Sequence, residues 1–438
     1  TNSAPPCRDP SSGCSPKATP LRSSIEGVSG EIAPFVGSVP SQPLYEVEMG
    51  HAPQATRMGT AKVRTPLALL CRKVRSLRRK HRRFGPKHGD FFAKLPKKPS
   101  AMNDYRIAHS YIKAEARRLG FFACGLSPAA PMDAAHVARR ERWLAEGCHG
   151  EMSYLARNEE KRRDPRLLVE GVRTIVSVAL NYHTPDPLGA DGRPRRLSIA
   201  RYARGQDYHE VMKSRLFALL NTLRAHYESA GGADAEAVFS TARAFTDTAP
   251  VDERYWAWRS GLGWIGKNTQ LIIPGAGSRF FLGELFLPFA ADAYDHPVES
   301  QCGACDRCLR GCPTQALSAE LGLDARKCLS YLSIEYRGET LPEGTGRKLG
   351  HMFYGCDRCT DCCPWNRLSV PTDVAEFYPS AALAAMSRDD WRGLTVEQYR
   401  ALFKGSAVKR AKYEGLMRNI RAAFPPSPAE ETKSESEP

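Results

Sequence analysis

The stretch CGACDRCLRGCP, residues 302–313, places four cysteines in the order C-x2-C-x2-C-x3-C-P. This spacing lets three thiolates converge on one 4Fe-4S cubane from a tight loop, while the fourth thiolate reaches a second cluster. A zinc site favours two separated pairs of cysteines, whereas three of these cysteines lie in one loop. The stretch therefore predicts an iron–sulfur protein with two 4Fe-4S clusters.

A second group of cysteines, in YGCDRCTDCCPWN at 354–366, repeats this design with one cysteine too many. Proline follows the crossing ligand in the first run, so Pro364 marks Cys363 as the reciprocal crossing ligand. One cluster is then bound by Cys302, Cys305, Cys308 and Cys363. The other takes Cys312, Cys356, Cys359 and a fourth ligand, either Cys328 or Cys362, which spacing alone leaves open.

The fourteen cysteines do not indicate a secreted disulfide framework, because that interpretation belongs to short chains with an export signal. Arg82-Arg83 is followed by no apolar segment, so we interpret it as a chance pair. No apolar run is long enough to span a membrane. These features predict a cytoplasmic protein, in which the isolated cysteines are free thiols: Cys7, Cys14, Cys71, Cys124 and Cys148.

The positive charge of the chain is concentrated at its start. The net charge is +15, and residues 1–101 hold 18 Lys and Arg against 6 Asp and Glu. These residues lack helical or strand periodicity, so we expect them to be disordered, with the native start at Met102. The alternative is a basic RNA-binding arm formed by RKVRSLRRKHRR at 72–83.

The periodicity after Met102 predicts alternating helices and strands. An amphipathic helix is expected from Met102 to Gly120, and another at 209–229. TIVSVALN at 174–181 has the β-branched, apolar composition of a buried strand. Further strands are expected at 237–241, 271–274 and 280–287. Alternation of this kind predicts an α/β layer domain.

These patterns divide the chain into five parts. We expect a disordered basic extension at 1–101, the α/β domain at 102–298, a ferredoxin-like domain with two 4Fe-4S clusters at 299–370, a C-terminal helical segment at 371–425 and a disordered tail at 426–438. Two clusters form an electron relay, so a further cofactor and the substrate are expected in the α/β domain. The segment 403–424 is expected to be one helix whose Lys409, Arg410, Lys412 and Arg418 are either tRNA contacts or solvated.

Four motifs resemble those of the epoxyqueuosine reductases. They are EKRRDPRLL at 160–168, ARGQDYHEVM at 203–212, FTDTAPVDERYWAWRSGLGWIGKN at 245–268 and YGCDRCTDCCPWN at 354–366. The resemblance runs from about Met102 to Phe424. It implies a cobalamin-binding α/β domain like that of the reductive dehalogenases, and reduction of epoxyqueuosine to queuosine at the tRNA wobble position, the last step of queuosine biosynthesis.

The resemblance also implies roles for individual residues. It makes Cys328 the fourth ligand of the second cluster, and Asp247 the catalytic acid. Opening an epoxide leaves an alkoxide, so a buried carboxyl with a raised pKa would supply the proton. The implied cobalamin contacts are Arg162, Asp247, Leu271, Leu282, Asp357 and Arg358, and pocket-lining positions for Tyr208, His209 and Lys267 are weaker expectations.

Simpler interpretations stand beside these. Asp247 alone would be a turn residue, and Arg162 a solvated surface group. The rival functions are a cobalamin-dependent reductase of a small molecule and an electron-transfer module, although a carrier needs only the cluster segment. We expect the tRNA anticodon stem-loop as substrate, a flavodoxin or ferredoxin as electron donor, no membrane association and a monomer.

Overall fold

A four-stranded sheet lies at the centre of the part of the chain that the computed structural model describes, residues 105–189 and 191–424. Its strand order is β2-β3-β7-β4, and every neighbouring pair is antiparallel. The predicted strands at 174–181 and 280–287 are confirmed with the same bounds. The strands are β2 (Ala123–Pro128), β3 (Thr174–Asn181), β4 (Arg243–Phe245) and β7 (Phe280–Leu287).

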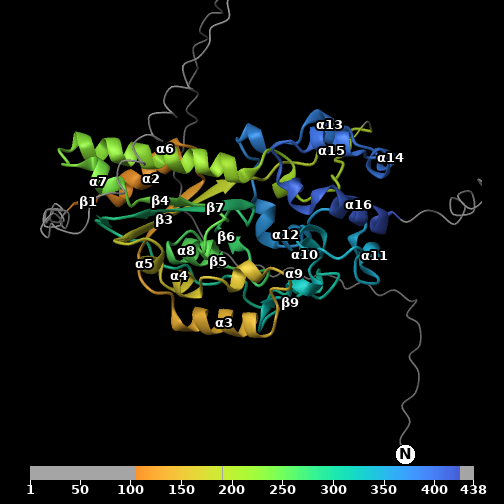
Figure 1. Cartoon of the computed structure of the whole chain (residues 1–438), viewed down its shortest axis with the longest axis horizontal. Coiled ribbons are helices and arrows are strands. Elements are labelled where there is room, and N and C mark those ends of the chain that lie inside the picture. The colour runs from red at the N-terminus through yellow and green to blue at the C-terminus, as the bar shows by residue number, and fades with distance from the viewer. Residues whose placement is uncertain (1–104, 190, 425–438) are drawn as a thin grey trace, which may run out of the picture. The chain divides into compact units, whose positions relative to one another are not determined.

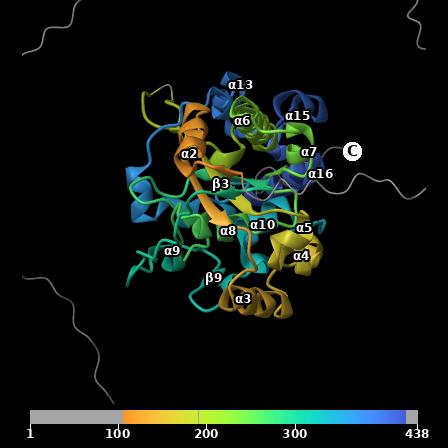
Figure 2. The ribbon, with the colours of Figure 1, turned by 90° about the vertical axis from the view of Figure 1, so that its left-hand side faces the viewer.

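Helices cover both faces of this sheet (Figures 1 and 2). On one face α2 (His109–Arg118) and α6 (Tyr208–Ser229) pack against it, and on the other lies α8 (Glu253–Arg259). All eight residues of β3 are buried. Val176 of β3 belongs to the core under α6, and Ile175 belongs to the core under α8. The apolar run is therefore explained by burial on both faces.

Three of the predicted elements differ from the structure. The segment predicted as a strand at 237–241 belongs to helix α7 (Ala235–Phe239), because Asp234 caps a helix by accepting a hydrogen bond from the backbone N–H of Ala237. The first predicted helix is α2 alone, preceded by β1 (Arg106–Ile107). At 271–274 only β6 (Leu271–Ile272) is a strand, paired with β5 (Trp264–Ile265).

The cysteine-rich segment is built from short elements. Helices α9 (Arg307–Arg310) and α12 (Arg358–Asp361), one in each cysteine group, lie against each other. Ile199 forms an isolated bridge with Tyr354, so the segment is joined directly to the preceding domain. The other elements of this segment are β9 (Leu317–Ser318), β10 (Gly322–Leu323), α10 (Leu329–Ile334) and α11 (Thr345–Leu349).

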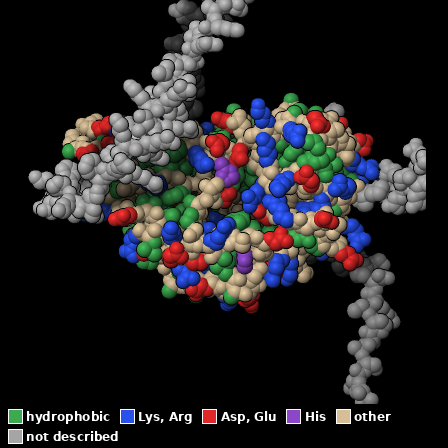
Figure 3. Space-filling view, in the orientation of Figure 1, with side chains coloured by type: hydrophobic (Ala, Val, Ile, Leu, Met, Phe, Trp, Pro, Cys, Tyr) green, Lys and Arg blue, Asp and Glu red, His purple; other side chains and the backbone are tan. Residues whose placement is uncertain are grey.

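The C-terminal segment packs around Trp391, Phe403 and Leu416 in an apolar core that also takes in Ile199 and Tyr354 from earlier in the chain. The predicted helix at 403–424 is broken: a 3-10 turn (Ala407–Ala411) precedes α16, and Lys412 has a positive φ of 60°. On one face of this half, Lys and Arg side chains lie among acidic ones (Figure 3). The helices are α13 (Ala381–Ala385), α14 (Arg388–Arg392), α15 (Val396–Leu402) and α16 (Lys412–Ala423).

The predicted extension at 1–101 and the tail at 426–438 lie outside the described residues, as do Cys7, Cys14 and Cys71. No disulfide joins any of the described cysteines, Cys124 and Cys148 included. Within residues 105–189 and 191–424, no helix combines the length and the apolar composition needed to span a membrane.

Candidate active site

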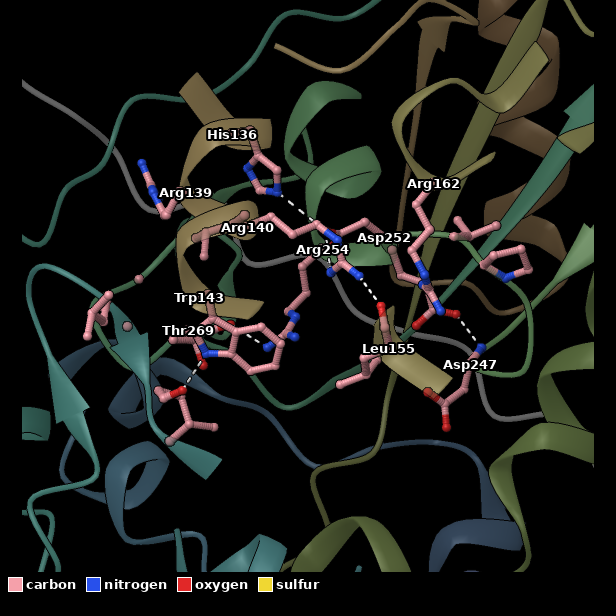
Figure 4. Close-up of a pocket in the computed structure, with 18 of the residues that line it drawn as sticks. His136, Arg139, Arg140, Trp143, Leu155, Arg162, Asp247, Asp252, Arg254 and Thr269 are labelled. Carbon is pink, nitrogen blue, oxygen red and sulfur yellow. Dashed lines mark hydrogen bonds and ion pairs between the residues drawn. The ribbon is translucent and has the colours of Figure 1, made fainter. Parts of the chain in front are cut away.

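A cavity of about 600 Å³ lies between the sheet domain and the cysteine-rich segment. Its walls come from α3 (Ala134–Ala145), α4 (Glu159–Arg163), the turn 247–254 that leads into α8, the loop after β5, and the β9–β10 turn. Figure 4 shows these side chains converging from separate elements. The cavity has the size of a site for a cofactor or a drug-sized ligand.

Arginines dominate the polar lining of this cavity. Arg162 is only 8% exposed. Its Nε donates a hydrogen bond to the carbonyl of Arg157 and its Nη2 donates one to the carbonyl of Tyr154, each at 3.4 Å. Burial lowers the pKa of Arg162, with the charge of Arg140 as a second cause. Such long bonds leave the guanidinium free to donate to a ligand. Arg162 and Asp247, which were both predicted to contact cobalamin, therefore line the same cavity.

Asp247 lies at the edge of the cavity, held by three side chains. Its Oδ2 accepts a hydrogen bond from the Tyr208 hydroxyl at 2.6 Å and lies 3.2 Å from His209 Nε2. Its backbone N–H donates to Glu253 Oε1 (Figure 4). The residue has a φ of 55°, which is uncommon for a non-glycine residue and needs contacts of this kind to hold it.

The expected buried carboxyl with a raised pKa at Asp247 is wrong. The side chain is 56% exposed, and the hydrogen bond with His209, followed by that with Tyr208, holds the pKa of Asp247 below its ordinary value. His209 in turn lies 2.6 Å from Asp207, and these two carboxylates raise the pKa of His209 to about 9. Asp247 is therefore ionised at neutral pH when the site is at rest.

A carboxyl with a raised pKa does exist beside Asp247. Burial and then the charge of Asp247 raise the pKa of Glu253 to about 8. Sequence reasoning missed Glu253, His136 and Asp252, although all three line the cavity. The signal was available for two of them, because Asp252-Glu253 follows Asp247 in one motif and opens helix α8.

A second, smaller cavity of about 110 Å³ is lined by the four cysteines predicted for one cluster. Cys302, Cys305 and Cys308 come from the first group, and Cys363 comes from the second. No three His, Cys, Asp or Glu side chains in the described ranges are arranged to hold a single metal ion. Each thiolate of a cubane binds its own iron, so the cavity suits a cluster.

The electrostatic neighbours of the remaining cysteines in the two groups bear on the ligands of the second cluster. Burial and the charges of Cys328 and Cys356 raise the pKa of Cys359. Burial and, less strongly, the charge of Cys312 raise the pKa of Cys328. For Cys362 the causes of a raised pKa are burial and then Cys363. The electrostatic cysteine neighbours of Cys328 thus belong to the second predicted set, whereas Cys362 neighbours Cys363 of the first set and Cys359 of the second. The ligand assignment stays a prediction.

Lys267 joins the two cavities, because it lines both of them. Its Nζ donates to the carbonyls of Gly303 at 2.7 Å and Cys305 at 2.9 Å, inside the first cysteine loop. The two cavities therefore share Lys267 as part of their walls. A shared wall suits the transfer of electrons from a cluster in the smaller cavity to a group bound in the larger one.

The remaining predicted cobalamin contacts do not line the large cavity. Leu271 and Leu282 belong to one apolar cluster behind it. Asp357 accepts a hydrogen bond from the backbone N–H of Arg201, and Arg358 donates to the carbonyl of Leu349. These four residues stay predictions.

Comparison with known proteins identifies the family. Residues 162–248 match the family described as "Epoxyqueuosine reductase QueG, DUF1730", and residues 301–366 match the "4Fe-4S double cluster binding domain". The epoxyqueuosine reductase of Cellulophaga algicola is 41% identical over 319 residues, which cover 73% of this chain and 99% of the relative. The chain belongs to the epoxyqueuosine reductase family. A second relative, the epoxyqueuosine reductase of Leadbetterella byssophila, is 42% identical over 73% of this chain and 98% of the relative.

Solved structures of the family share the fold. An epoxyqueuosine reductase in complex with an epoxyqueuosine-modified tRNA stem loop is 27% identical, with a TM-score of 0.61 over 72% of this chain and 80% of that one. The Bacillus subtilis enzyme, with its catalytic loop swung out of the active site, is 26% identical with a TM-score of 0.60 over the same shares. The predicted family and cluster module are confirmed.

Proposed function

We propose that this chain reduces epoxyqueuosine to queuosine in tRNA, the final step of queuosine biosynthesis. The observation that carries the proposal is Asp247 at the edge of a large cavity whose wall, Lys267, also lines the cysteine cavity. A carboxylate that can carry protons to a substrate and the cysteines proposed to hold a cluster thus border one site. Relatives 36–42% identical to this chain are named epoxyqueuosine reductases, which favours this substrate over a small-molecule one.

The cofactors of this reaction are two 4Fe-4S clusters and cobalamin. The clusters are assigned to Cys302, Cys305, Cys308 and Cys363, and to Cys312, Cys328, Cys356 and Cys359. Cobalamin suits the large cavity, since the buried Thr269 hydroxyl there has no hydrogen-bond partner among the described residues and would pair with an amide of a corrinoid. When bound and reduced, cobalamin supplies the electrons at the substrate.

Asp247 is proposed to handle the protons of the reaction. Breaking a C–O bond of the epoxide produces an alkoxide, which must be protonated before the oxygen can leave. The exposed side chain of Asp247 can reach a nucleoside that projects into the cavity. Tyr208 and His209 hold its carboxylate in place, which limits the orientations open to it.

The arginine-rich lining supports an RNA substrate, because guanidinium groups bind phosphates through paired N–H donors. Arg139, Arg140 and Arg254 line the cavity with Arg162. The proposed tRNA contact at Arg418 is wrong: this residue is buried and donates to the carbonyls of Leu332 and Gly338. An electron donor of the flavodoxin or ferredoxin type, a monomeric state and a cytoplasmic location stay predictions.

Conversion of an epoxyqueuosine-containing anticodon stem-loop RNA tests the proposal. The chain is purified without oxygen, reduced chemically and assayed with and without added cobalamin. We expect about eight irons per chain, and queuosine formation that requires cobalamin. Turnover of a halogenated aromatic compound with no conversion of the RNA would contradict the proposed substrate.

A further inference from the structure

The proposed reaction needs more protons than Asp247 alone can carry. The inference drawn from this rests on the proposed function. Converting an epoxide to an alkene consumes two electrons and two protons. The first broken C–O bond leaves an alkoxide that takes one proton, and the second breaks as the oxygen departs in water, which takes another. The clusters and a chemical reductant supply the electrons. Asp247 carries one proton at most, and it is ionised at rest.

Glu253 is placed to supply protons next to Asp247. It lines the large cavity, and its Oε1 accepts the backbone N–H of Asp247. It is the first residue of α8, six positions after Asp247, so the turn between them keeps the two carboxyl groups together. A carboxyl that stays protonated is a suitable proton donor near neutral pH.

Glu284 lies on strand β7, which contacts α8, the helix that begins with Glu253. It is fully buried, opposite Ser177 of β3 and Phe245 of β4. In the described part of the chain neither of its carboxylate oxygens has a hydrogen-bond partner. An isolated buried carboxylate is very unfavourable, so this carboxyl is expected to hold a proton. Its electrostatic neighbours are Glu253 and then Asp252, and no basic side chain is among them.

We propose that Glu253 and Glu284 form a pair of neighbouring carboxyl groups that stores the two protons of each turnover and passes them to Asp247 one at a time. The proton passes from the Glu253 carboxyl to the Asp247 carboxylate, and from there to the oxygen that leaves the substrate. A side-chain rotation then brings the Glu284 carboxyl, which has no hydrogen-bond partner among the described residues at rest, to Glu253 and re-protonates it. This second proton takes the same route before the oxygen departs in water, and solvent restores both protons after product release. Glu253 and Glu284 act through Asp247 and are positioning residues.

The charged surroundings of the pair define its pH dependence. Burial and the charges of Asp247 and Asp252 favour the protonated form of Glu253, whereas the hydrogen bond from the Asp247 N–H and the charge of Arg254 oppose it. From α6, the Tyr208 hydroxyl faces this pair, and the charge of Glu253 contributes to the raised pKa of Tyr208. Since the pKa of Glu253 is raised to about 8, the proton is present below this pH and lost above it. The rate should therefore fall as the pH rises through about 8.

His209 is the competing proton source, because it also contacts Asp247. Its proton is shared between two carboxylates, Asp207 and Asp247, which raise its pKa to about 9. A proton held this firmly is released less readily than that of Glu253. Replacing His209 with Gln should therefore leave the fall in rate near pH 8 in place, whereas loss of that fall would identify His209 as the donor and overturn the proposal.

The test compares Glu253→Gln and Glu284→Gln with the parent, using holoenzyme with equal iron and cobalamin content. Glutamine keeps the acceptor for the Asp247 N–H but carries no acidic proton. We expect single-turnover rates lower by about 10² in Glu253→Gln, with no fall near pH 8, and partial recovery in Glu253→Asp. A parental rate and pH profile in Glu253→Gln would overturn the proposal.

An infrared measurement without substrate provides an independent readout. The parent should show the carbonyl band of a protonated carboxyl at neutral pH, and this band should weaken in both glutamine variants. A parental band in both variants would overturn the proposal even if activity fell. If the parent shows the pH-sensitive band but converts no epoxyqueuosine, the proposed function fails while the carboxyl pair stands.

Discussion

At the scale of single residues, the choice between Cys328 and Cys362 decides the ligands of the second cluster. Cys328 lies among Cys312, Cys356 and Cys359, whereas the Sγ of Cys362 points to the carbonyls of Arg307 and Cys359. We expect Cys328→Ser to lower the iron content by about half and Cys362→Ser to leave it unchanged. Iron analysis and electron paramagnetic resonance make the comparison. Loss of iron in Cys362→Ser alone would reverse the assignment.

The predictability of individual residues depended on the kind of signal they leave. The cysteines were predictable because their chemistry depends on spacing along the chain. Asp247 was found through its motif. Its exposure and its lowered pKa could not be predicted, because the contacts with Tyr208 and His209 form only when distant parts of the chain fold together. Glu284 was missed, although a lone carboxylate in the apolar strand FFLGELFL was a usable signal.

At the scale of secondary-structure elements, long apolar runs gave reliable predictions. Strands β3 and β7 were predicted with the correct bounds, because burial on both faces leaves no polar alternation to confuse the pattern. The short segment at 237–241 was assigned wrongly because the capping by Asp234 outweighed the two β-branched residues within it, Val238 and Thr241. The antiparallel strand order depends on contacts distant in sequence, which no local pattern encodes.

The close packing of β2 against the end of α8 gives a prediction for Gly125. A Cβ at this position would lie 1.9 Å from the carbonyl oxygen of Ser260, a backbone atom that cannot rotate away. Gly125→Ala should therefore lower the free energy of unfolding by about 1–3 kcal/mol. Chemical denaturation measures the change.

Gly393→Ala is the matched control, because its Cβ would meet its nearest atom, the carbonyl oxygen of Asp389, at 3.4 Å. This variant should unfold within about 0.5 kcal/mol of the parent. Equal stabilities of the Gly125 and Gly393 variants would show that strand β2 shifts to make room.

At the scale of the whole molecule, relatives indicate how much of the chain the reaction needs. The Cellulophaga algicola enzyme is matched over 99% of its length by 73% of this chain. We therefore expect a protein that starts at Met102 to keep its cluster content and its turnover of the stem-loop RNA. Iron analysis and the conversion assay test this directly.

Binding to tRNA separates this expectation from the basic-arm alternative. If the truncated protein bound tRNA more than about tenfold more weakly, a difference near 1.4 kcal/mol, the stretch from Arg72 to Arg83 would be a functional arm. A salt titration would then show a smaller slope for the truncated protein, because fewer phosphates are neutralised.

The central claim is that Asp247 delivers the protons while the clusters deliver the electrons, and single-turnover conversion of the stem-loop RNA by Asp247→Asn tests it most directly. Asp373→Asn, at an exposed position, is the matched control. With equal iron and cobalamin content, Asp247→Asn should convert epoxyqueuosine about 10² to 10⁴ times more slowly than the parent, and Asp373→Asn at the parental rate. Conversion by Asp247→Asn at the parental rate would contradict the account.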